Sequence, residues 1–160
     1  MNKLTIIFVS SLASSEVNDP TDTLLHEQLE MLYKACENGN SKSCGFIGLD
    51  YYIIKNYSKS FEFNEKACCG NEPSGCESIA SMYEEGLGVT RNYSKALVFY
   101  KKACDYNLAI GCIGIGAMYK NGKGIQQDMS QAKTYYEKAC QLKNPYACKT
   151  ANLISDLLSK

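Results

Sequence analysis

Cysteine is the residue type in this chain whose number and spacing could do chemistry. There are nine cysteines in 160 residues, and eight of them form four pairs whose members stand eight positions apart. The pairs are Cys36 and Cys44, Cys68 and Cys76, Cys104 and Cys112, and Cys140 and Cys148. Cysteines at regular spacing can bind a metal ion or form disulfides.

The surrounding residues favour disulfides over a metal site. Zinc sites use closely spaced ligands such as Cys-x-x-Cys with further Cys or His. Here no pair has that spacing, and His26, for which we expect a solvated or capping role, is the only histidine. We therefore expect disulfides within each pair, with no metal and no cofactor, in an oxidising compartment. Metal binding is the less favoured alternative.

Cys69 is the exception to the pairing. It follows Cys68 directly and makes the cysteine count odd. We expect a free thiol buried at a helix end, because unpaired cysteines are usually buried. The alternatives are a disulfide to a second molecule and exchange with Cys68. A nucleophilic role is disfavoured, since no histidine is placed to activate the thiol.

The cysteine pairs belong to an internal repeat. A shift of 36 residues aligns Gly75-Cys76 with Gly111-Cys112, Met82-Tyr83 with Met118-Tyr119, Gly86 and Gly88 with Gly122 and Gly124, and Lys102-Ala103-Cys104 with Lys138-Ala139-Cys140. Self-similarity at this period is typical of a solenoid. The sequence thus predicts an all-α fold of about four αα-hairpins.

Each repeat reads as two helices, predicted at 77–85 and 95–105 and again at 113–120 and 131–141. The Gly-x-Gly segment after the first helix suits a helix end that needs positive φ. Ser94 and Ser130 stand where N-caps of the second helices are expected. The first cysteine of a pair ends one helix and the second begins the next, so an antiparallel hairpin brings them together.

The first hairpin and the two ends depart from the repeat. The segment between Tyr51 and Asn56 is four residues short, which predicts a tight turn without glycine. Pro73 and Pro145 suit the first turn of a helix. We expect an opening helix at 22–37 and a closing helix at 145–160, whose polar outer face caps the array.

The N-terminal residues resemble an export signal. Met1-Asn2-Lys3 precedes an apolar run over 4–9, and Ser11-Leu12-Ala13 offers small residues for cleavage near 13–15. We expect a signal peptide at 1–13, a repeat array at 22–160, and a secreted or periplasmic protein. A disordered or truncated N-terminus is the alternative. No later stretch is apolar enough for a membrane span, and the 17 basic and 17 acidic residues do not favour nucleic acid.

The pattern Gly-Cys, Met-Tyr, Gly-x-Gly, Ser-x-Ala and Lys-Ala-Cys resembles the Sel1-like repeat, a relative of the tetratricopeptide repeat. The cysteines eight positions apart are similar to those of the Helicobacter cysteine-rich protein family. This resemblance implies a secreted, right-handed superhelix with a disulfide in each hairpin. It also implies two competing functions, β-lactam binding or hydrolysis and the binding of peptide or host partners on a concave surface.

The residues do not assemble a β-lactamase site. Ser130 and Lys133 match Ser-x-x-Lys, but the equivalent segments of the other repeats lack the lysine. Lys149-Thr150-Ala151 lacks the glycine of a Lys-Thr-Gly motif and lies on a predicted helix. One histidine cannot hold the zinc of a metallo-enzyme. We therefore assign no catalytic residue.

We expect a monomer that binds a peptide, a protein or a peptidoglycan-like ligand on its concave face, with β-lactam hydrolysis as the alternative. Tyrosine supplies rigid contact area. The non-repeating tyrosines are candidates for the binding surface: Tyr33, Tyr52, Tyr106 and Tyr146. The repeating ones are expected to be structural: Tyr83, Tyr100, Tyr119 and Tyr136.

Overall fold

The computed structural model describes the backbone of residues 20–159 and the side chains of residues 27–159. All of its regular elements there are helices, which confirms the predicted fold class. They are α2 (Pro20–Glu37), α3 (Ser41–Ile53), α4 (Tyr57–Cys69), α5 (Pro73–Glu85), α6 (Tyr93–Asp105), α7 (Ala109–Asn121), α8 (Met129–Gln141) and α9 (Pro145–Leu158). The signal peptide expected at 1–13 lies outside the described residues.

Three complete hairpins follow one another, namely α3–α4, α5–α6 and α7–α8. In the second and third hairpins, the second helix begins at a side-chain cap two residues before the expected serine. Asn92 and Asp128 have extended backbones, and their side-chain oxygens accept hydrogen bonds from the N–H groups of Lys95 and Gln131. The prediction that Ser94 and Ser130 are N-caps is therefore wrong. Asn and Asp cap as well as Ser does, so the earlier residue starts the helix and the serine falls within its first turn.

The turns between helices follow the prediction. Gly86 and Gly122 have φ of 77° and 65°, and the second glycine of each Gly-x-Gly is also left-handed. In the short turn of the first hairpin the left-handed residue is Lys55, with φ of 62°. A glycine-free turn is confirmed there. Pro73 and Pro145 begin α5 and α9, as expected.

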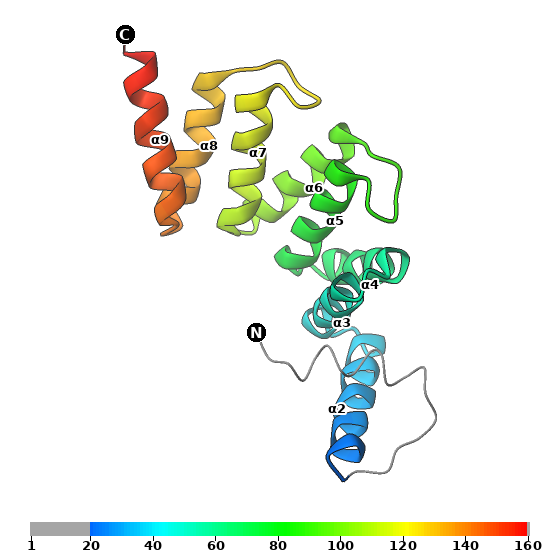
Figure 1. Ribbon diagram of the computed structural model, residues 1–160. Helices are drawn as coiled ribbons and strands as arrows, with labels where there is room; N and C mark the ends of the chain where they lie inside the picture. Colours follow the sequence, from blue (N-terminus) through cyan, green and yellow to red (C-terminus); the bar gives the residue numbers. More distant parts are fainter. Residues whose placement is uncertain (1–19, 160) are drawn as a thin grey trace. The chain divides into compact units, whose positions relative to one another are not determined.

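The chain divides into two compact units, residues 1–75 and 76–160. In the first unit α3 packs against both α2 and α4, around a core that includes Ile47, Tyr51 and Ala67. In the second unit α6, α7, α8 and α9 pack in chain order, and α7, α8 and α9 lie side by side (Figure 1). Its core contains Met118 and Tyr136.

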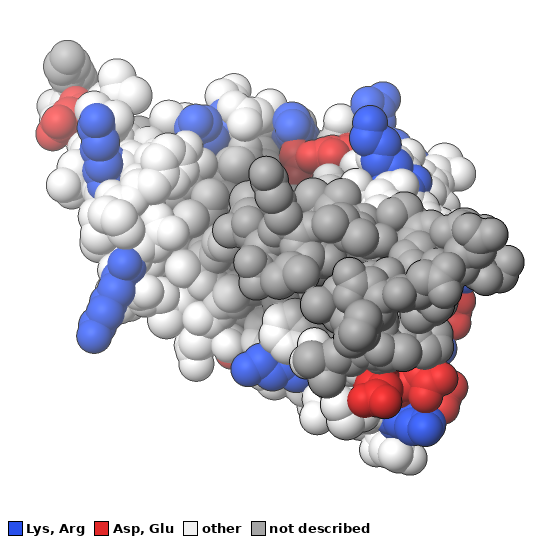
Figure 2. Space-filling model, turned by 60° about the horizontal axis from the view of Figure 1, so that its bottom comes forward, with Lys and Arg blue, Asp and Glu red and all other residues white. Residues whose placement is uncertain are grey.

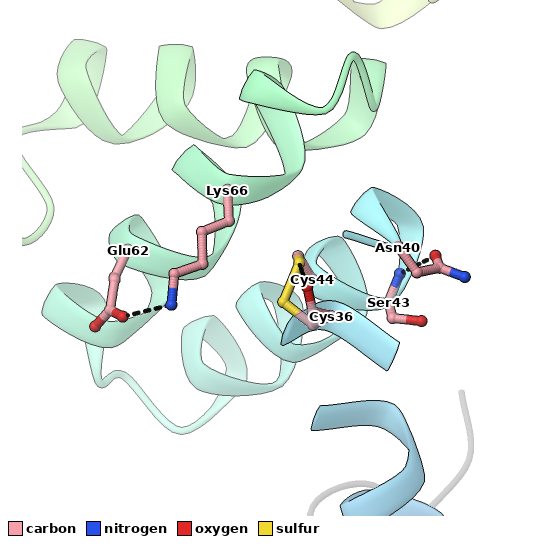
Figure 3. The surroundings of a disulfide bond; sticks show 6 residues. All are labelled: Cys36, Asn40, Ser43, Cys44, Glu62 and Lys66. Atoms are coloured by element: carbon pink, nitrogen blue, oxygen red, sulfur yellow. Dashed lines mark hydrogen bonds and ion pairs between the residues drawn. A yellow bond between two sulfur atoms is a disulfide. The ribbon is translucent and has the colours of Figure 1, made fainter. Parts of the chain in front are cut away.

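Disulfides join the end of one helix to the first turn of the next. The Cα–Cα distances are 4.8 Å for Cys36–Cys44, 4.7 Å for Cys104–Cys112 and 4.6 Å for Cys140–Cys148. Cys68 and Cys76 are also disulfide-bonded. Figure 3 shows the first bridge beside the cap in which Asn40 accepts a hydrogen bond from the Ser43 N–H at 3.1 Å. Each bridge closes a loop of about nine residues, which stabilises the fold by roughly 2 to 3 kcal/mol.

Cys69 is a free thiol, and it is exposed. The prediction of a buried thiol is therefore wrong. Consecutive residues of a helix point about 100° apart. Cys68 is only 2% exposed, so the side chain of the next residue, Cys69, points away from this buried face of α4.

Candidate ligand-binding surfaces

The first helix of each hairpin carries a stripe of residues in one register. Counted from the second cysteine of each pair, positions −2, +2, +5 and +9 recur at helical spacing and share one face. We call these residues the first-helix stripe. They are Lys42, Phe46, Leu49 and Ile53 on α3; Ser74, Ser78, Ser81 and Glu85 on α5; Ile110, Gly114, Ala117 and Asn121 on α7; and Tyr146, Thr150, Leu153 and Leu157 on α9.

Three of the four stripe residues on α3, and three of the four on α9, are bulky and largely apolar. Phe46, Leu49 and Ile53 are 50%, 51% and 37% exposed. On α9, Tyr146, Leu153 and Leu157 are more than half exposed. Single exposed apolar residues are common, but several in line indicate an interaction site. On α5 the same positions are mostly serine, and on α7 the two middle ones are glycine and alanine.

Helix α7 packs against α8 with one of its faces, and the equivalent face of α9 is polar. A Cβ on Gly116 would lie 3.0 Å from the Tyr136 ring, so this face of α7 touches α8. The equivalent residue of α9, four positions after its cysteine, is the exposed Asn152. Lys149 and Asp156 are exposed on the same side of α9. This agrees with the polar face expected of a closing helix, whose capping role stays a prediction.

A cavity of about 570 Å³ lies within the first unit. Its lining includes Tyr33, the Cys36–Cys44 bridge, Phe63, Lys66 and Cys69. The Tyr33 ring meets Phe63 edge-on at 5.5 Å between centroids. Burial, and then a hydrogen bond with the Tyr51 hydroxyl at 2.8 Å, raise the pKa of the Tyr33 hydroxyl. The phenol therefore stays neutral at physiological pH.

Lys66 borders this cavity with its charge already paired. Its ammonium lies 2.9 Å from a carboxylate oxygen of Glu62 (Figure 3). The same ammonium lies 4.7 Å from the centre of the Phe63 ring. The cavity thus has an aromatic wall, an ion pair and an accessible thiol.

Each hairpin contains one stacked aromatic pair between its two helices. The pairs are Tyr51–Phe63, Tyr83–Phe99 and Tyr119–Tyr135, with centroid distances of 5.6, 5.9 and 5.8 Å and interplanar angles of 16°, 15° and 14°. In the first two hairpins a lysine lies over the tyrosine. The ammonium groups of Lys59 and Lys95 are each 5.1 Å from the ring centres of Tyr51 and Tyr83.

The other tyrosines differ in exposure. Tyr100 and Tyr136 are buried. Tyr100 donates a hydrogen bond to Glu84 at 2.9 Å, and its pKa is raised first by burial and then by the Glu84 charge. Among the tyrosines suggested for recognition, Tyr106 and Tyr146 are exposed at 43% and 58%. Tyr33 and Tyr52 are half-buried.

The residues that matched β-lactamase motifs are not arranged for catalysis. Ser130 is exposed in the first turn of α8. The ammonium of Lys133 lies 3.6 Å from the Glu137 carboxylate, one turn further along the helix. Thr150 lies on α9 and donates its hydroxyl hydrogen bond to the Tyr146 carbonyl at 2.9 Å. His26 is in α2, but its side chain is outside the described part.

The charges of the molecule are mixed. Figure 2 shows basic and acidic residues interspersed on the face drawn. Among the described residues, no group of three or more Cys, His, Asp and Glu could hold a metal ion. No helix in the described part of the chain is long and apolar enough to cross a membrane.

Solved structures with the same fold support this architecture. A Sel1 repeat protein from Oxalobacter formigenes is 22% identical with a TM-score of 0.71 over 82% of this chain, which spans 60% of that protein. Helicobacter pylori cysteine-rich protein B is 31% identical with a TM-score of 0.64, over 83% of this chain and 98% of its own. A protective antigen of uropathogenic Escherichia coli is 19% identical with a TM-score of 0.65, over 79% of this chain and 31% of its own.

A search of curated proteins finds no significant match to the sequence. The model of the Sel1 repeat, by contrast, matches three consecutive segments, residues 43–72, 73–105 and 106–144. These segments cover all but the first two residues of the helices in the three complete hairpins that carry the aromatic pairs. They cover more than half of the chain, which therefore belongs to the Sel1 repeat family.

Proposed function

We propose that this protein binds a peptide or protein partner through the first-helix stripe of α3. The observation that carries the proposal is the line of exposed bulky residues on one face of α3, namely Phe46, Leu49 and Ile53. Packing within the chain does not require them, because α5 has Ser78 and Ser81 where α3 has the first two. Stacked helix pairs commonly present extended binding surfaces of this kind.

The chemistry of the stripe favours apolar side chains in the partner. Covering the exposed half of a residue such as Leu49 contributes roughly 1 kcal/mol, so several such contacts in line are needed for useful affinity. On α7 the equivalent Gly114 lets the Tyr100 ring pack close to the helix, since a Cβ there would lie 2.7 Å from that ring.

We place this activity outside the cytoplasm, in a secreted or periplasmic protein. The support is the disulfides that flank each hairpin, because such bonds form and persist mainly in oxidising compartments. The same environment suits a protein that meets peptide, protein or peptidoglycan-like partners outside the cell that makes it.

Selection from a phage-displayed random peptide library tests the proposal. The full chain is the bait, and the double variant Phe46→Ser, Leu49→Ser is the counter-bait. The serines reproduce the α5 residues, so the variant should fold. Val98→Ser, at a residue 65% exposed outside the stripe, is the matched control. We expect peptides rich in apolar residues that bind the chain and the control but not the double variant. Equal binding to all three would refute the proposal.

Hydrolysis of β-lactams is not favoured by these residues, and a direct assay decides it. Lys133 pairs with Glu137, so it is poorly placed to take a proton from Ser130. We expect the purified protein and its Ser130→Ala variant to open a chromogenic cephalosporin at the same background rate. Catalytic turnover that is lost in Ser130→Ala would overturn this expectation.

A further inference from the structure

The third hairpin lacks the lysine that covers the aromatic pair in the other two. Lys59 and Lys95 place an ammonium over a tyrosine ring in the first and second hairpins. The residue at the same repeat position in the third hairpin is Gln131. The stacked pair below it, Tyr119–Tyr135, keeps the geometry of the others. The third hairpin therefore retains the aromatic platform without its internal cation.

The helix cap beside this position also changes its charge. The cap is a neutral asparagine, Asn56 or Asn92, in the first two hairpins, and it is Asp128 in the third. The cap and the residue three positions later carry a net charge of +1 (0 for Asn, +1 for Lys) in each of the first two hairpins. In the third they carry −1 (−1 for Asp, 0 for Gln).

A hollow of about 470 Å³ occupies this place in the third hairpin. It is lined by Tyr119, Ile125, Gln126, Gln127, Asp128 and Gln131. The second hairpin has a hollow of about 380 Å³ lined by Tyr83, Asn92, Ser94, Lys95, Val98 and Phe99. Three positions are shared between the two, namely the tyrosine, the cap and the residue that is lysine in one and glutamine in the other.

The wall of the third hollow is held in place before any ligand arrives. Gln127 donates its side-chain amide to the Lys120 carbonyl at 2.8 Å, and the Asp128 N–H donates to the Tyr119 carbonyl at 3.0 Å. The ammonium of Lys123, in the same loop, lies 2.8 Å from the Glu84 carboxylate. That contact anchors the loop to α5 and offsets the nearby positive charge.

We propose that the hollow of the third hairpin binds an organic cation, a guanidinium or ammonium group, in the place that lysine fills in the other hairpins. The face of Tyr119 attracts a cation through its quadrupole, and the carboxylate of Asp128 adds the opposite charge. The positive end of the α8 dipole opposes a cation there. The carboxylate cap offsets it, and Lys95 occupies the same place on α6 with only a neutral cap.

A guanidinium fits better than a compact ammonium. It is planar, can stack on the tyrosine and can donate several hydrogen bonds to the carboxylate and amide oxygens of Asp128, Gln126 and Gln131. The cation could come from an arginine side chain of a partner or from a free small molecule. This site does not depend on the first-helix stripe.

Nuclear magnetic resonance titration of the full chain tests the site and separates the two sources. The probes are an acetylated, amidated alanine pentapeptide with a central arginine, the same peptide with neutral citrulline, and free arginine. We expect the arginine peptide to shift the amide signals around residues 119, 128 and 131 with millimolar affinity, and citrulline to have no effect. Equal shifts by the two peptides, or none by either cation, would overturn the proposal. If free arginine shifts the same amide signals as the arginine peptide, the cation alone is sufficient for binding and no peptide is needed.

Variants that copy the other hairpins complete the test. Gln131→Lys should fill the site from within and abolish the response. Asp128→Asn keeps a helix cap and should weaken binding by about threefold to tenfold. The double change Asn92→Asp, Lys95→Gln should create a second cation site in the second hairpin. The proposal fails if Gln131→Lys leaves arginine binding unchanged.

Discussion

At the scale of single residues, the first hairpin is stabilised by a pair of buried polar residues that the other hairpins lack. The Ser60 hydroxyl donates to the Gly48 carbonyl at 2.8 Å, and the Asn64 amide donates to the Ser60 carbonyl at 2.9 Å. The second hairpin has Ala96 and Tyr100 at these two positions. In the first hairpin, hydrogen bonds of the buried asparagine take the place of the tyrosine packing found in the second, and these bonds satisfy its polar atoms inside the core.

The fit between Gly48 and Asn64 leads to a mutational prediction. A Cβ on Gly48 would lie 2.7 Å from the Asn64 amide. We expect Gly48→Ala to lower the free energy of unfolding by about 1 to 3 kcal/mol, measured by urea denaturation. In the Asn64→Ala background the same change should cost less.

Gly45→Ala is the matched control for this pair, because a Cβ there meets its nearest atoms at an ordinary 3.6 Å. It should be neutral or slightly stabilising, since alanine favours helix. Equal destabilisation by Gly45→Ala and Gly48→Ala would contradict the steric explanation.

Asp50 makes stability depend on pH. Burial raises the pKa of its carboxyl from 3.8 to about 6. Between these values the folded state keeps a proton that the unfolded state has lost, so the contribution of Asp50 to stability falls as pH rises and is lowest above pH 6. We expect Asp50→Asn to gain stability relative to the parent between pH 4 and pH 7 in urea titrations. A gain that is the same at both pH values would show that the carboxyl does not titrate with folding.

At the scale of helices and turns, the first hairpin closes with a side chain where the others use glycine. Lys55 adopts φ of 62° in the short turn between α3 and α4, whereas Gly86 and Gly122 follow the first helices of the next two hairpins. The left-handed region costs a residue with a Cβ roughly 1 kcal/mol. The shortened turn therefore carries a small strain.

Lys55→Gly should relieve that strain. We expect the free energy of unfolding to rise by up to about 1 kcal/mol, reduced by the greater freedom of glycine in the unfolded chain. The measurement is chemical denaturation beside Gly122→Ala, which should destabilise. If Lys55→Gly destabilises the protein as strongly as Gly122→Ala does, the left-handed backbone at Lys55 carries no strain that glycine can relieve.

At the scale of the whole molecule, covalent bonds supplement the thin cores of the two units. Each repeat of a solenoid contacts only its neighbours, so a bridge at each junction between hairpins supports a core that packing alone would leave small. All eight paired cysteines are in disulfides, and Cys69 is exposed. The accessible thiol lines the cavity of the first unit.

Thiol counting follows directly from this arrangement. We expect the protein from an oxidising compartment to react with one equivalent of a thiol reagent without denaturant, and with nine after denaturation and reduction. Cys69→Ser should remove the native reaction. Five or more reactive thiols in the native protein would contradict the disulfide framework.

The sequence by itself determined the helix pairs, their turns and the pairing of the cysteines into disulfides. Those features depend on local chemistry, since Gly-x-Gly needs positive φ, proline suits a first turn, and cysteines at hairpin ends are close in space once the helices form. The helix caps were misplaced by two residues because Asn, Asp and Ser can all cap, and only the backbone shows which one does.

Only the tertiary structure decided which side chains are available to a partner. The register that exposes Phe46 and Leu49, the exposure of Cys69 and the hollow over Tyr119 depend on which face of each helix meets its neighbours. A periodic pattern predicts that a helix has a buried face, but packing across the hairpin selects it. The replacement of lysine by Gln131 is visible in the sequence, yet it acquired a meaning only when the equivalent lysines were found over their tyrosines.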